Sequence, residues 1–386
     1  MGRFEAALRA PGLGVIAEIK RRSPSAGDLR PDADPARIAP SYATAGAAAI
    51  SVLVDERFAG TWDDLRAARA ATDAPLLAKG FFSTADELRT AREAGADAAL
   101  LLLRDLDDDL ARTLLAEAGR LGLDALVEAH DAEEVARAVA LEAPVVGVNA
   151  RDLSTFAIDR RAQLALLAAI PADRVVIAES GIESRAQGAA AELAGADAIL
   201  VGSALMRAPD PAVRLAELAS RPLVKVCGLT RDEDVAAAAE AGADLLGFVL
   251  ARESPRAAPG VLPVPETTLA VAVWVGTAGS SDADLDQVHD VEAGKVRGRE
   301  ATLFAGATPV ARVLDLPWGE DDPGHWARAA TAEGRVVLAG GLGPENVAAA
   351  IDAVRPWAVD ASSSLERAPG IKDHERVRAY VEAARG

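Results

Sequence analysis

The feature that most constrains the fold of this chain is a repeated alternation of short apolar runs with Ala-, Leu- and Glu-rich segments of helical period. Such runs are typical of parallel β-strands that are buried on both faces and connected by helices. Eight strand–helix units are the number that closes a TIM barrel, so the first half of the chain predicts one. The eight runs lie at residues 15–20, 48–55, 75–81, 98–104, 125–130, 145–149, 175–180 and 198–202.

The tetrapeptide Ala-Gly-Ala-Asp recurs three times, at residues 94–97, 194–197 and 241–244. Each copy follows a helical segment and precedes an apolar run, which is where a glycine ends a helix before the next strand. The third copy lies beyond the first eight runs. The strand–helix rhythm therefore continues into the second half of the chain.

The 386 residues exceed the size at which one hydrophobic core stops growing, so two domains are expected. A helical segment ends before Pro222 and a new strand follows at once, which predicts domains at 1–220 and 221–386 without a flexible linker. The second half offers strands at 223–227, 245–250, 269–275, 310–315, 336–339 and 357–360, with a weak one near 295–303. We therefore predict two tandem (β/α)8 TIM-type barrels, the second shortened or irregular because a unit is lost.

Composition narrows the functions that such a chain can have. No apolar run is long enough to cross a bilayer, and Met1–Gly12 has no apolar signal region, so a cytoplasmic protein is expected. The net charge of −18, with no basic stripe, disfavours nucleic acid as a partner. Cys227 is the only cysteine and the four histidines lack ligand spacing, so we expect no metal site. The sequence leaves the oligomeric state open, and a monomer is compatible with it.

Polar and charged residues end an unusual number of the apolar runs in the first half. The carboxyl ends of TIM-barrel strands form the active site, so these side chains are expected to meet there. Buried acids and bases in one cluster acquire shifted pKa values and are suited to general acid–base catalysis. The residues are Glu18, Lys20, Lys79, Glu128, Asn149, Arg151 and Glu179.

Small residues end the last two runs of the first half. Ser180-Gly181 and Gly202-Ser203 expose backbone N–H groups at the seventh and eighth strands, the usual phosphate site of a TIM barrel. We therefore expect a small phosphorylated substrate.

Five strings of the first half resemble indole-3-glycerol phosphate synthase, over essentially residues 4–219. They are Ile16-Ala-Glu-Ile-Lys-Arg-Arg-Ser-Pro-Ser25, Leu126-Val-Glu-Ala-His130, Gly147-Val-Asn-Ala-Arg-Asp152, Ala178-Glu-Ser-Gly-Ile182 and Leu200-Val-Gly202. The resemblance implies ring closure of 1-(2-carboxyphenylamino)-1-deoxyribulose 5-phosphate to the indole, with loss of CO2 and water and without a cofactor. The chain departs from the family at Gly80 and Ala150 and has a short helical extension before the first strand.

The same resemblance implies the role of each site residue. Lys79 would be the general acid and Glu128 the general base, while Lys20 and Glu18 would orient the substrate. Asn149 and Glu179 would hold the substrate hydroxyls, and Arg151 would contribute to substrate binding. The residues expected around the phosphate are Ser23, Ser180, Gly181, Gly202 and Ser203.

The second half resembles phosphoribosylanthranilate isomerase, the enzyme of the preceding step. The strings are Leu223-Val-Lys-Val-Cys-Gly-Leu-Thr-Arg231, Gly247-Phe-Val-Leu250, Ser254-Pro-Arg256, Leu338-Ala-Gly-Gly-Leu342, Pro344-Glu-Asn346, Val359-Asp-Ala-Ser-Ser363 and Pro369-Gly-Ile-Lys-Asp373. By resemblance, Cys227 would be the base of an Amadori isomerisation and Asp315 the acid. The residues implied in substrate and phosphate binding are Arg256, Gly340, Gly341, Ser362 and Ser363.

Two departures make the isomerase half incomplete at the level of sequence. The Gly-rich segment that follows the acid in the family is replaced by Trp318-Gly-Glu-Asp-Asp322, and the Gln-Leu-His-Gly string of an earlier strand is not found. Asp315 could then belong to the fifth strand, with the acid strand missing and Asp360 as the next candidate.

Three interpretations follow. The first is an enzyme that catalyses both consecutive steps of tryptophan biosynthesis. The second is a synthase fused to a noncatalytic isomerase-like module that binds or stabilises. The third is a phosphosugar-binding array of barrels with another purpose, against which Lys79 and Glu128 argue.

Overall fold

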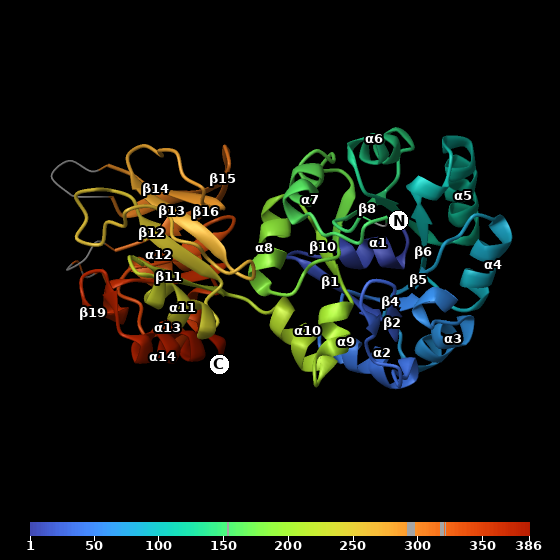
Figure 1. Ribbon diagram of the computed structural model, residues 1–386, viewed down its shortest axis with the longest axis horizontal. Helices are drawn as coiled ribbons and strands as arrows, with labels where there is room; N and C mark the ends of the chain where they lie inside the picture. Colours follow the sequence, from blue (N-terminus) through green and yellow to red (C-terminus); the bar gives the residue numbers. More distant parts are fainter. Residues whose placement is uncertain (153, 292–297, 317–319, 321) are drawn as a thin grey trace. The chain divides into compact units, whose positions relative to one another are not determined.

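The computed structural model describes residues 1–152, 154–291, 298–316, 320 and 322–386. It divides into two compact units, Met1–Glu183 with Gly188–Ala219, and Ser184–Gln187 with Ser220–Gly386. Each unit contains a closed barrel of eight strands (Figure 1). The prediction of two tandem TIM-type barrels is therefore confirmed.

The first barrel is parallel throughout, and its strands follow the chain around the barrel. All eight predicted runs form strands because the interior and the outer helices bury both faces of the sheet. The strands are β1 (Gly14–Ile19), β4 (Ala49–Leu53), β5 (Leu76–Lys79), β6 (Ala98–Leu102), β7 (Asp124–Ala129), β8 (Val145–Asn149), β9 (Val175–Glu179) and β10 (Ala198–Val201). The short strands β2 (Arg22–Ser23) and β3 (Gly27–Asp28) pair beyond the end of β1.

The helices of this first half are mostly amphipathic, and six of them begin with a side-chain N-cap. Asp34, Thr61, Thr84, Asp107, Asp131 and Asp159 accept a backbone N–H of the first turn. The helices are α1 (Arg3–Leu8), α2 (Pro35–Thr44), α3 (Trp62–Ala71), α4 (Ala85–Glu93), α5 (Asp108–Leu121), α6 (Ala132–Ala140), α7 (Arg160–Leu167), α8 (Arg185–Leu193), α9 (Ser203–Arg207) and α10 (Pro211–Ala219). Two single turns of 3-10 helix, η1 (Glu56–Phe58) and η2 (Leu103–Asp105), follow strands β4 and β6.

Helix α1 covers the amino-terminal end of the first barrel. Its Phe4 and Leu8 are at most 1% exposed and pack against inward side chains such as Ile16 and Leu126. The carboxylate of Asp124, at the start of β7, accepts the backbone N–H groups of Gly2 and Glu5 at 2.9 Å each. One end of the barrel is thereby filled with apolar side chains, and the chemistry is left to the other.

The second barrel also has eight strands, which corrects the expectation of six or seven. Leu285–His289 forms a strand that the sequence did not indicate, and the weak one near 295–303 is Glu300–Ala305; residues 295–297 lie outside the described residues. The strands are β11 (Leu223–Cys227), β12 (Leu245–Val249), β13 (Leu269–Val275), β14 (Leu285–His289), β15 (Glu300–Ala305), β16 (Thr308–Leu314), β17 (Val336–Leu338) and β18 (Ala358–Ala361).

The irregularity of the second barrel lies in one strand direction and in the connections. Strand β15 is antiparallel to both β14 and β16, and it joins β16 through the two residues Gly306 and Ala307. Helices of this unit are α11 (Asp232–Glu240), α12 (His325–Ala330), α13 (Val347–Val354) and α14 (His374–Arg385), with η3 (Ser363–Leu365) and the hairpin β19 (Glu366–Ala368) and β20 (Ile371–Lys372). The barrel has therefore kept its strands, and the described residues between β12 and β16 contain no helix.

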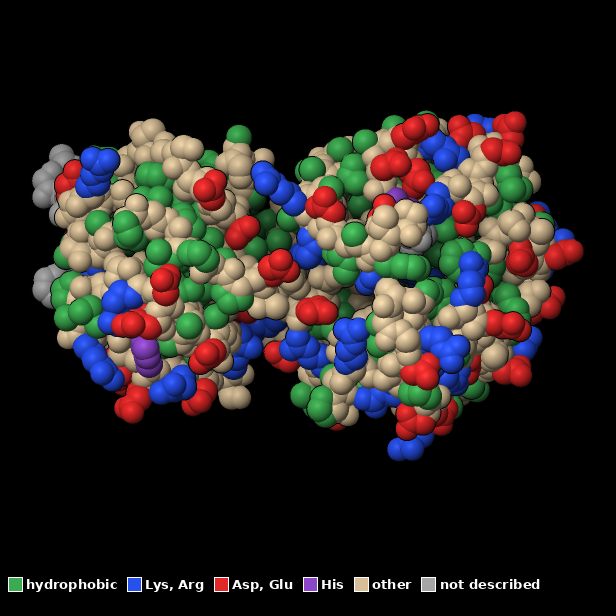
Figure 2. All heavy atoms as spheres, viewed as in Figure 1, with side chains coloured by type: hydrophobic (Ala, Val, Ile, Leu, Met, Phe, Trp, Pro, Cys, Tyr) green, Lys and Arg blue, Asp and Glu red, His purple; other side chains and the backbone are tan. Residues whose placement is uncertain are grey.

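The surface agrees with the acidic composition. Asp and Glu side chains alternate with Lys and Arg over the visible face of each unit (Figure 2). Within the described ranges, no helix combines the length and apolar character that a membrane crossing requires.

Candidate active site

The first barrel brings its polar side chains together by the two-residue period of its strands. Alternate residues of a barrel strand face the interior, so an inward apolar residue is followed two positions later by an inward polar one. Glu18 follows the buried Ile16, Lys79 follows Leu77, and Glu128 follows Leu126. Glu179 follows Ile177 in the same way. The carboxyl ends of the strands thus carry one inward cluster.

Lys79 lies at the centre of this cluster. Its Nζ forms an ion pair with Glu179 Oε2 and lies 3.5 Å from Glu128 Oε2 and 3.8 Å from Glu18 Oε2. Lys20 Nζ, in turn, contacts Glu18 Oε1 at 2.7 Å. Two ammonium groups therefore lie among three carboxyl groups in a buried site and offset most of their charge.

This arrangement sets distinct protonation states for the acids and the base. Burial opposes the charge of Lys79, but Glu179, Glu128 and Glu18 outweigh it and raise the pKa of the ammonium. Burial and the neighbouring Glu128 raise the pKa of Glu179 to about 8. For Glu128, burial is outweighed by Lys79 and His130, and the pKa is lowered. The cluster thus holds the Lys79 ammonium beside an ionised Glu128 and a Glu179 whose pKa is raised.

Two glycines make room for these long side chains. A side chain at Gly147 of β8 would collide with Glu179 Oε1, and one at Gly202 would collide with Glu18 Oε1. Gly202 was predicted for phosphate contact; here its missing side chain also leaves space for Glu18 and Lys20.

Two further polar residues approach Glu128. Asn149 donates its side-chain amide to Glu128 Oε1 at 2.9 Å, as expected for neighbouring strand ends. His130, which belongs to a quoted string but was assigned no role, places Nε2 3.3 Å from the same oxygen. Its inward position two residues after Glu128 is the signal that the sequence carried.

The cluster opens into a cavity of about 450 Å³. Apart from Glu179, which contacts Lys79, every first-half site residue predicted above lines this cavity. The lining residues among those predictions are Glu18, Lys20, Ser23, Lys79, Glu128, Asn149, Arg151, Ser180, Gly181, Gly202 and Ser203.

Part of the cavity wall is aromatic and was not predicted. Phe58 and Phe81 stack with ring centroids 6.3 Å apart, and the Arg57 guanidinium carbon lies 3.6 Å from the centre of the Phe81 ring. Both rings line the cavity, which gives it a surface suited to a planar aromatic substrate group. Phe58 belongs to the η1 turn, where no strand period applies, whereas Phe81 lies two residues after the inward Lys79 and so carried the same kind of signal as His130.

The predicted phosphate loops lie at the same cavity. Ser180 and Gly181 both have positive φ values, 67° and 70°, which turns the chain sharply after β9. Arg151 donates to Ser25 Oγ at 3.2 Å, and Ser25 in turn lies 3.1 Å from Ser23 Oγ. Arg207, which the sequence did not single out, also lines the cavity and supplies a further cation.

In the second barrel, Cys227 ends strand β11 and is buried and free. Lys225, the preceding inward residue, donates to Asp360 Oδ2 at 2.7 Å and to Gln287 Oε1 at 2.8 Å. Burial raises the pKa of the Cys227 thiol, while Lys225 and Lys372 act in the opposite direction. The thiol thus lies in a buried site with two cations nearby.

Gln287 and His289 correct another expectation. They occupy β14, the fourth strand of the barrel, as Gln287-Val-His289, where the family has Gln-Leu-His-Gly. Gln287 Nε2 lies 2.9 Å from His289 Nε2 inside the barrel. The fourth strand is therefore present, and it carries two of the family's polar residues.

Asp315 follows β16, the sixth strand of the barrel, rather than the fifth. The alternative that Asp315 ends the fifth strand and that the strand carrying the acid is missing was therefore wrong. Its backbone N–H donates to Arg299 O at 2.8 Å, which ties it to the start of β15. Asp360, the alternative acid, is instead paired with Lys225. Three of the five residues that replace the Gly-rich segment, at 318, 319 and 321, lie outside the described residues.

Arg256 and Lys372 meet at one carboxylate beyond Cys227. Arg256 Nε lies 2.9 Å from both oxygens of Glu366, and Lys372 Nζ lies 2.9 Å from Glu366 Oε1. Lys372 also donates to the backbone oxygen of Ser362 at 3.1 Å. The pairing of Arg256 with Glu366 was not predicted.

The remaining predicted residues lie on the loops after β17 and β18. Gly340 and Gly341 follow β17 with φ values of 90° and 66°, and Ser363 begins η3. Ser364 Oγ donates to Leu342 O, which holds the two loops together. The seventh and eighth strand ends of this barrel therefore adjoin, as the prediction of a phosphate site requires. Among the described residues, no group of His, Cys, Asp and Glu has the arrangement of a metal site.

Comparison with known proteins gives the following similar chains. An indole-3-glycerol phosphate synthase of Nocardioides sp. (strain ATCC BAA-499 / JS614) is 53% identical over 207 residues, which cover 53% of this chain and 79% of the relative. That of Mycobacterium ulcerans is 45% identical over 214 residues, 55% of this chain and 79% of the relative. Among solved structures, TrpF from Jonesia denitrificans is 31% identical, covering 43% of this chain and 98% of that one, with a TM-score of 0.35.

Two family models match the sequence. The model of indole-3-glycerol phosphate synthase matches residues 3–218, and that of N-(5'phosphoribosyl)anthranilate isomerase matches residues 325–383. The first match covers more than half of the chain and contains the whole Lys79 cluster. The chain therefore belongs to the indole-3-glycerol phosphate synthase family and joins to it, in one polypeptide, a domain of the phosphoribosylanthranilate isomerase family, both of tryptophan biosynthesis.

Proposed function

We propose that residues 1–220 convert 1-(2-carboxyphenylamino)-1-deoxyribulose 5-phosphate to indole-3-glycerol phosphate. The observation that carries this proposal is the Lys79 ammonium, which three carboxylates surround in a substrate-sized cavity with an aromatic wall. Ring closure requires a buried acid beside the ketose oxygen, and aromatisation requires a base beside the carbon that loses its proton. The cavity provides one of each.

In this mechanism Lys79 protonates the ketose oxygen while the aromatic carbon that carries the carboxyl group attacks the ketose carbon. The carboxyl group then leaves as CO2, and its bonding electrons restore the aromatic ring. Lys79 next donates a proton to the departing hydroxyl, which leaves as water, and Glu128 removes a proton from the adjacent carbon to form the indole double bond. Glu179, whose pKa is raised, can take up a proton from solvent and pass it to Lys79 between the two steps.

The phosphate is assigned to the opposite part of the cavity. Ser180, Gly181 and Ser203 offer backbone N–H groups there, and Arg151 and Arg207 supply positive charge. The planar anthranilate ring is assigned to the wall formed by Phe58 and Phe81. These assignments fix the substrate at both ends, so that Lys79 and Glu128 lie beside the reacting carbons.

For the second barrel we propose Amadori isomerisation of N-(5-phosphoribosyl)anthranilate. Asp315 would protonate the furanose ring oxygen as the ring opens, and the Cys227 thiolate would remove the proton from the sugar C2. The position of Asp315 after the sixth strand supports its assignment over Asp360, which Lys225 already holds. Arg256 and Lys372 are positioned for anionic groups of the substrate once these compete with Glu366.

Purified protein assayed for each step separately tests both proposals. Turnover of both substrates would support a two-step enzyme, whereas synthase activity without isomerase activity would favour the noncatalytic module. We also propose that the two sites function independently on either side of residue 220. A soluble, folded chain ending at Ser220 should therefore retain synthase turnover, and an inactive one would contradict a self-contained first site.

A further inference from the structure

The two oxygens of Glu128 have different partners. Oε2 faces Lys79 Nζ at 3.5 Å, whereas Oε1 accepts the Asn149 amide at 2.9 Å and lies 3.3 Å from His130 Nε2. Because Lys79 must also donate to the substrate oxygen, its hold on Oε2 weakens during the reaction. His130 then remains as the second group able to carry positive charge beside this buried carboxylate.

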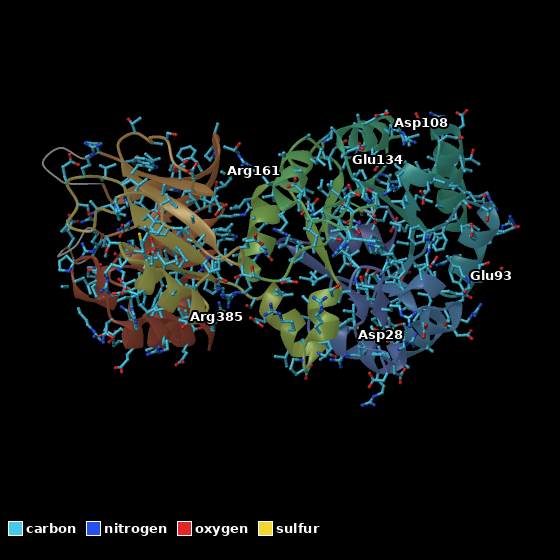
Figure 3. The ribbon with its side chains drawn as sticks, viewed as in Figure 1. Asp28, Glu93, Asp108, Glu134, Arg161 and Arg385 are labelled. Carbon is cyan, nitrogen blue, oxygen red and sulfur yellow. The ribbon has the colours of Figure 1, made fainter. Side chains whose placement is uncertain are left out.

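Glu134 fixes His130 from the other side. Its Oε2 lies 3.1 Å from His130 Nδ1 and accepts the His130 backbone N–H at 2.8 Å. Glu134 belongs to the first turn of α6 (Figure 3), where its own N–H is bound by the N-cap Asp131 at 2.8 Å. A carboxylate can only accept, so Nδ1 carries a proton and Nε2 is directed to Glu128.

The imidazole also forms a boundary between two cavities. Glu128 lines the 450 Å³ substrate cavity, whereas His130 and Glu134 line a second cavity of about 710 Å³; Asn149 and Arg151 line both. The His130 side chain is only 12% exposed. The other charged groups around this outer cavity carry both signs: Arg104, Asp131, Glu133, Arg137, Arg151, Asp152 and Asp159. The direct contacts of His130 to Glu128 and Glu134 are therefore its main electrostatic interactions.

We propose that His130, oriented by Glu134, is a positioning residue for the general base: as an imidazolium it holds the Glu128 carboxylate in place and keeps it ionised while Lys79 serves the substrate. This role rests on the synthase function proposed above. The electrostatics agree with it, because burial lowers the pKa of His130 but Glu128 and Glu134 outweigh burial and raise it. His130 also contributes to the lowered pKa of Glu128.

The test is the pH dependence of synthase kcat in the full chain for His130→Gln and His130→Phe. Loss of the positive charge raises the pKa of Glu128, so the acid limb of the profile should move to higher pH in both variants. His130→Phe should also lose about tenfold or more in kcat at the optimum, because the charged contact that positions the Glu128 carboxylate is removed. His130→Gln should retain more kcat than His130→Phe, but only at high pH. The Gln amide can orient the Glu128 carboxylate, but it carries no positive charge that would keep Glu128 ionised at lower pH.

Two matched variants on α6 sharpen the test. Glu134→Gln keeps one acceptor oxygen for His130 but removes the charge, so it should move the acid limb in the same direction by less. Glu133→Gln removes the same charge one residue away without a contact to His130, so its profile should match the wild type. KM should change little in all four variants, because neither His130 nor its α6 neighbours line the substrate cavity.

The outcomes separate this role from the function on which it rests. An inactive, folded wild-type protein would overturn the synthase function itself. Wild-type turnover with an unshifted acid limb in folded His130→Gln and Glu134→Gln would overturn the role of His130. A drop in kcat at every pH with no shift would make His130 a purely structural residue and would also contradict the proposal.

Discussion

The two barrels close with the same number of strands but fill their interiors differently. Inward residues of the first barrel are apolar below the active-site end, as Ile16, Leu77 and Leu126 illustrate. The second barrel instead places the ion pair of Lys225 and Asp360 inside, extended by Gln287 and His289. An apolar interior stabilises in proportion to the area that it buries, whereas a buried ion pair must first offset the desolvation of both charges. The first barrel confines its charges to the strand ends, and the second carries them into its core.

The largest expected effect is loss of catalysis in the first barrel. Lys79→Ala and Glu128→Gln should each lower synthase turnover by ~100- to 10,000-fold, because a positioned general acid or base is removed. Both variants should keep their isomerase activity, which serves as the internal control. A correctly folded variant that retains more than a tenth of wild-type synthase turnover would show that the role is wrongly assigned.

The next largest effect should be on the stability of the second barrel, whose interior contains the buried ion pair. Lys225→Met leaves Asp360 buried without its cation, which typically costs ~3–5 kcal/mol in the free energy of unfolding. The double variant Lys225→Met/Asp360→Leu should recover most of that loss, because no charge is then left buried. Four of the five tryptophans, at 274, 318, 326 and 357, belong to the second half, so fluorescence during urea unfolding reports this barrel. If the double variant were as unstable as the single one, the pair would be more than a mutually compensated charge.

Substitutions at the isomerase site should lower isomerase turnover by about a hundredfold. Cys227→Ser should lower isomerase turnover by that much, since a hydroxyl is a far weaker base, and Asp315→Asn should do so as the ring-opening acid. Because burial raises the pKa of the thiol, wild-type isomerase activity should rise with pH to values above the usual thiol range. Activity that survives Asp315→Asn but not Asp360→Asn would move the acid to the last strand.

The smallest effect concerns the helices that surround the barrels. Helices α2 to α7 begin with a side-chain cap, whereas α11, α12 and α13 have none. Thr84→Ala removes the cap of α4 and should cost about 1 kcal/mol of stability.

The matched control for this cap is Thr90→Ala in the same helix, where Thr90 Oγ1 bonds only to Asp86 O. It should be neutral or slightly stabilising, because alanine is the better helix former. The stability of both variants is measured as the synthase activity that remains after equilibration in urea. Equal losses of stability in Thr84→Ala and Thr90→Ala would show that the Thr84 cap contributes no more to stability than an ordinary exposed threonine.

The difference between the two barrel interiors also explains which strands could be predicted from the sequence. All eight strands of the first barrel were predicted, because burial on both faces produces uninterrupted apolar runs. Strand β14 was missed because its buried positions include Gln287 and His289, which leave no apolar run. The direction of β15 could not be predicted either. A strand can form hydrogen bonds with its neighbours in the parallel or the antiparallel direction, and the pattern of its side chains does not show which.

The residues of the candidate site also differ in whether the sequence could predict them. Glu18, Lys79, Glu128 and Glu179 could be predicted because each ends an apolar run on the inward side of its strand. Phe58 and Arg207 lie outside the strands, where no strand period places a side chain in the cavity. The reach of Glu179 across Gly147 depends on three-dimensional proximity of two strands and could not be deduced from either string alone.

The reversed strand β15 has a consequence for altering the chain. Because β15 runs against its neighbours, the turn at Gly306 and Ala307 lies at the rim opposite the carboxyl ends of β14 and β16, and so on the far side from Cys227 and Asp315. Gly306 has a φ of 58°, as in a tight hairpin turn. A reporter peptide or new chain termini introduced here would meet no catalytic loop, which makes this turn the natural point for inserting a sequence or permuting the second domain.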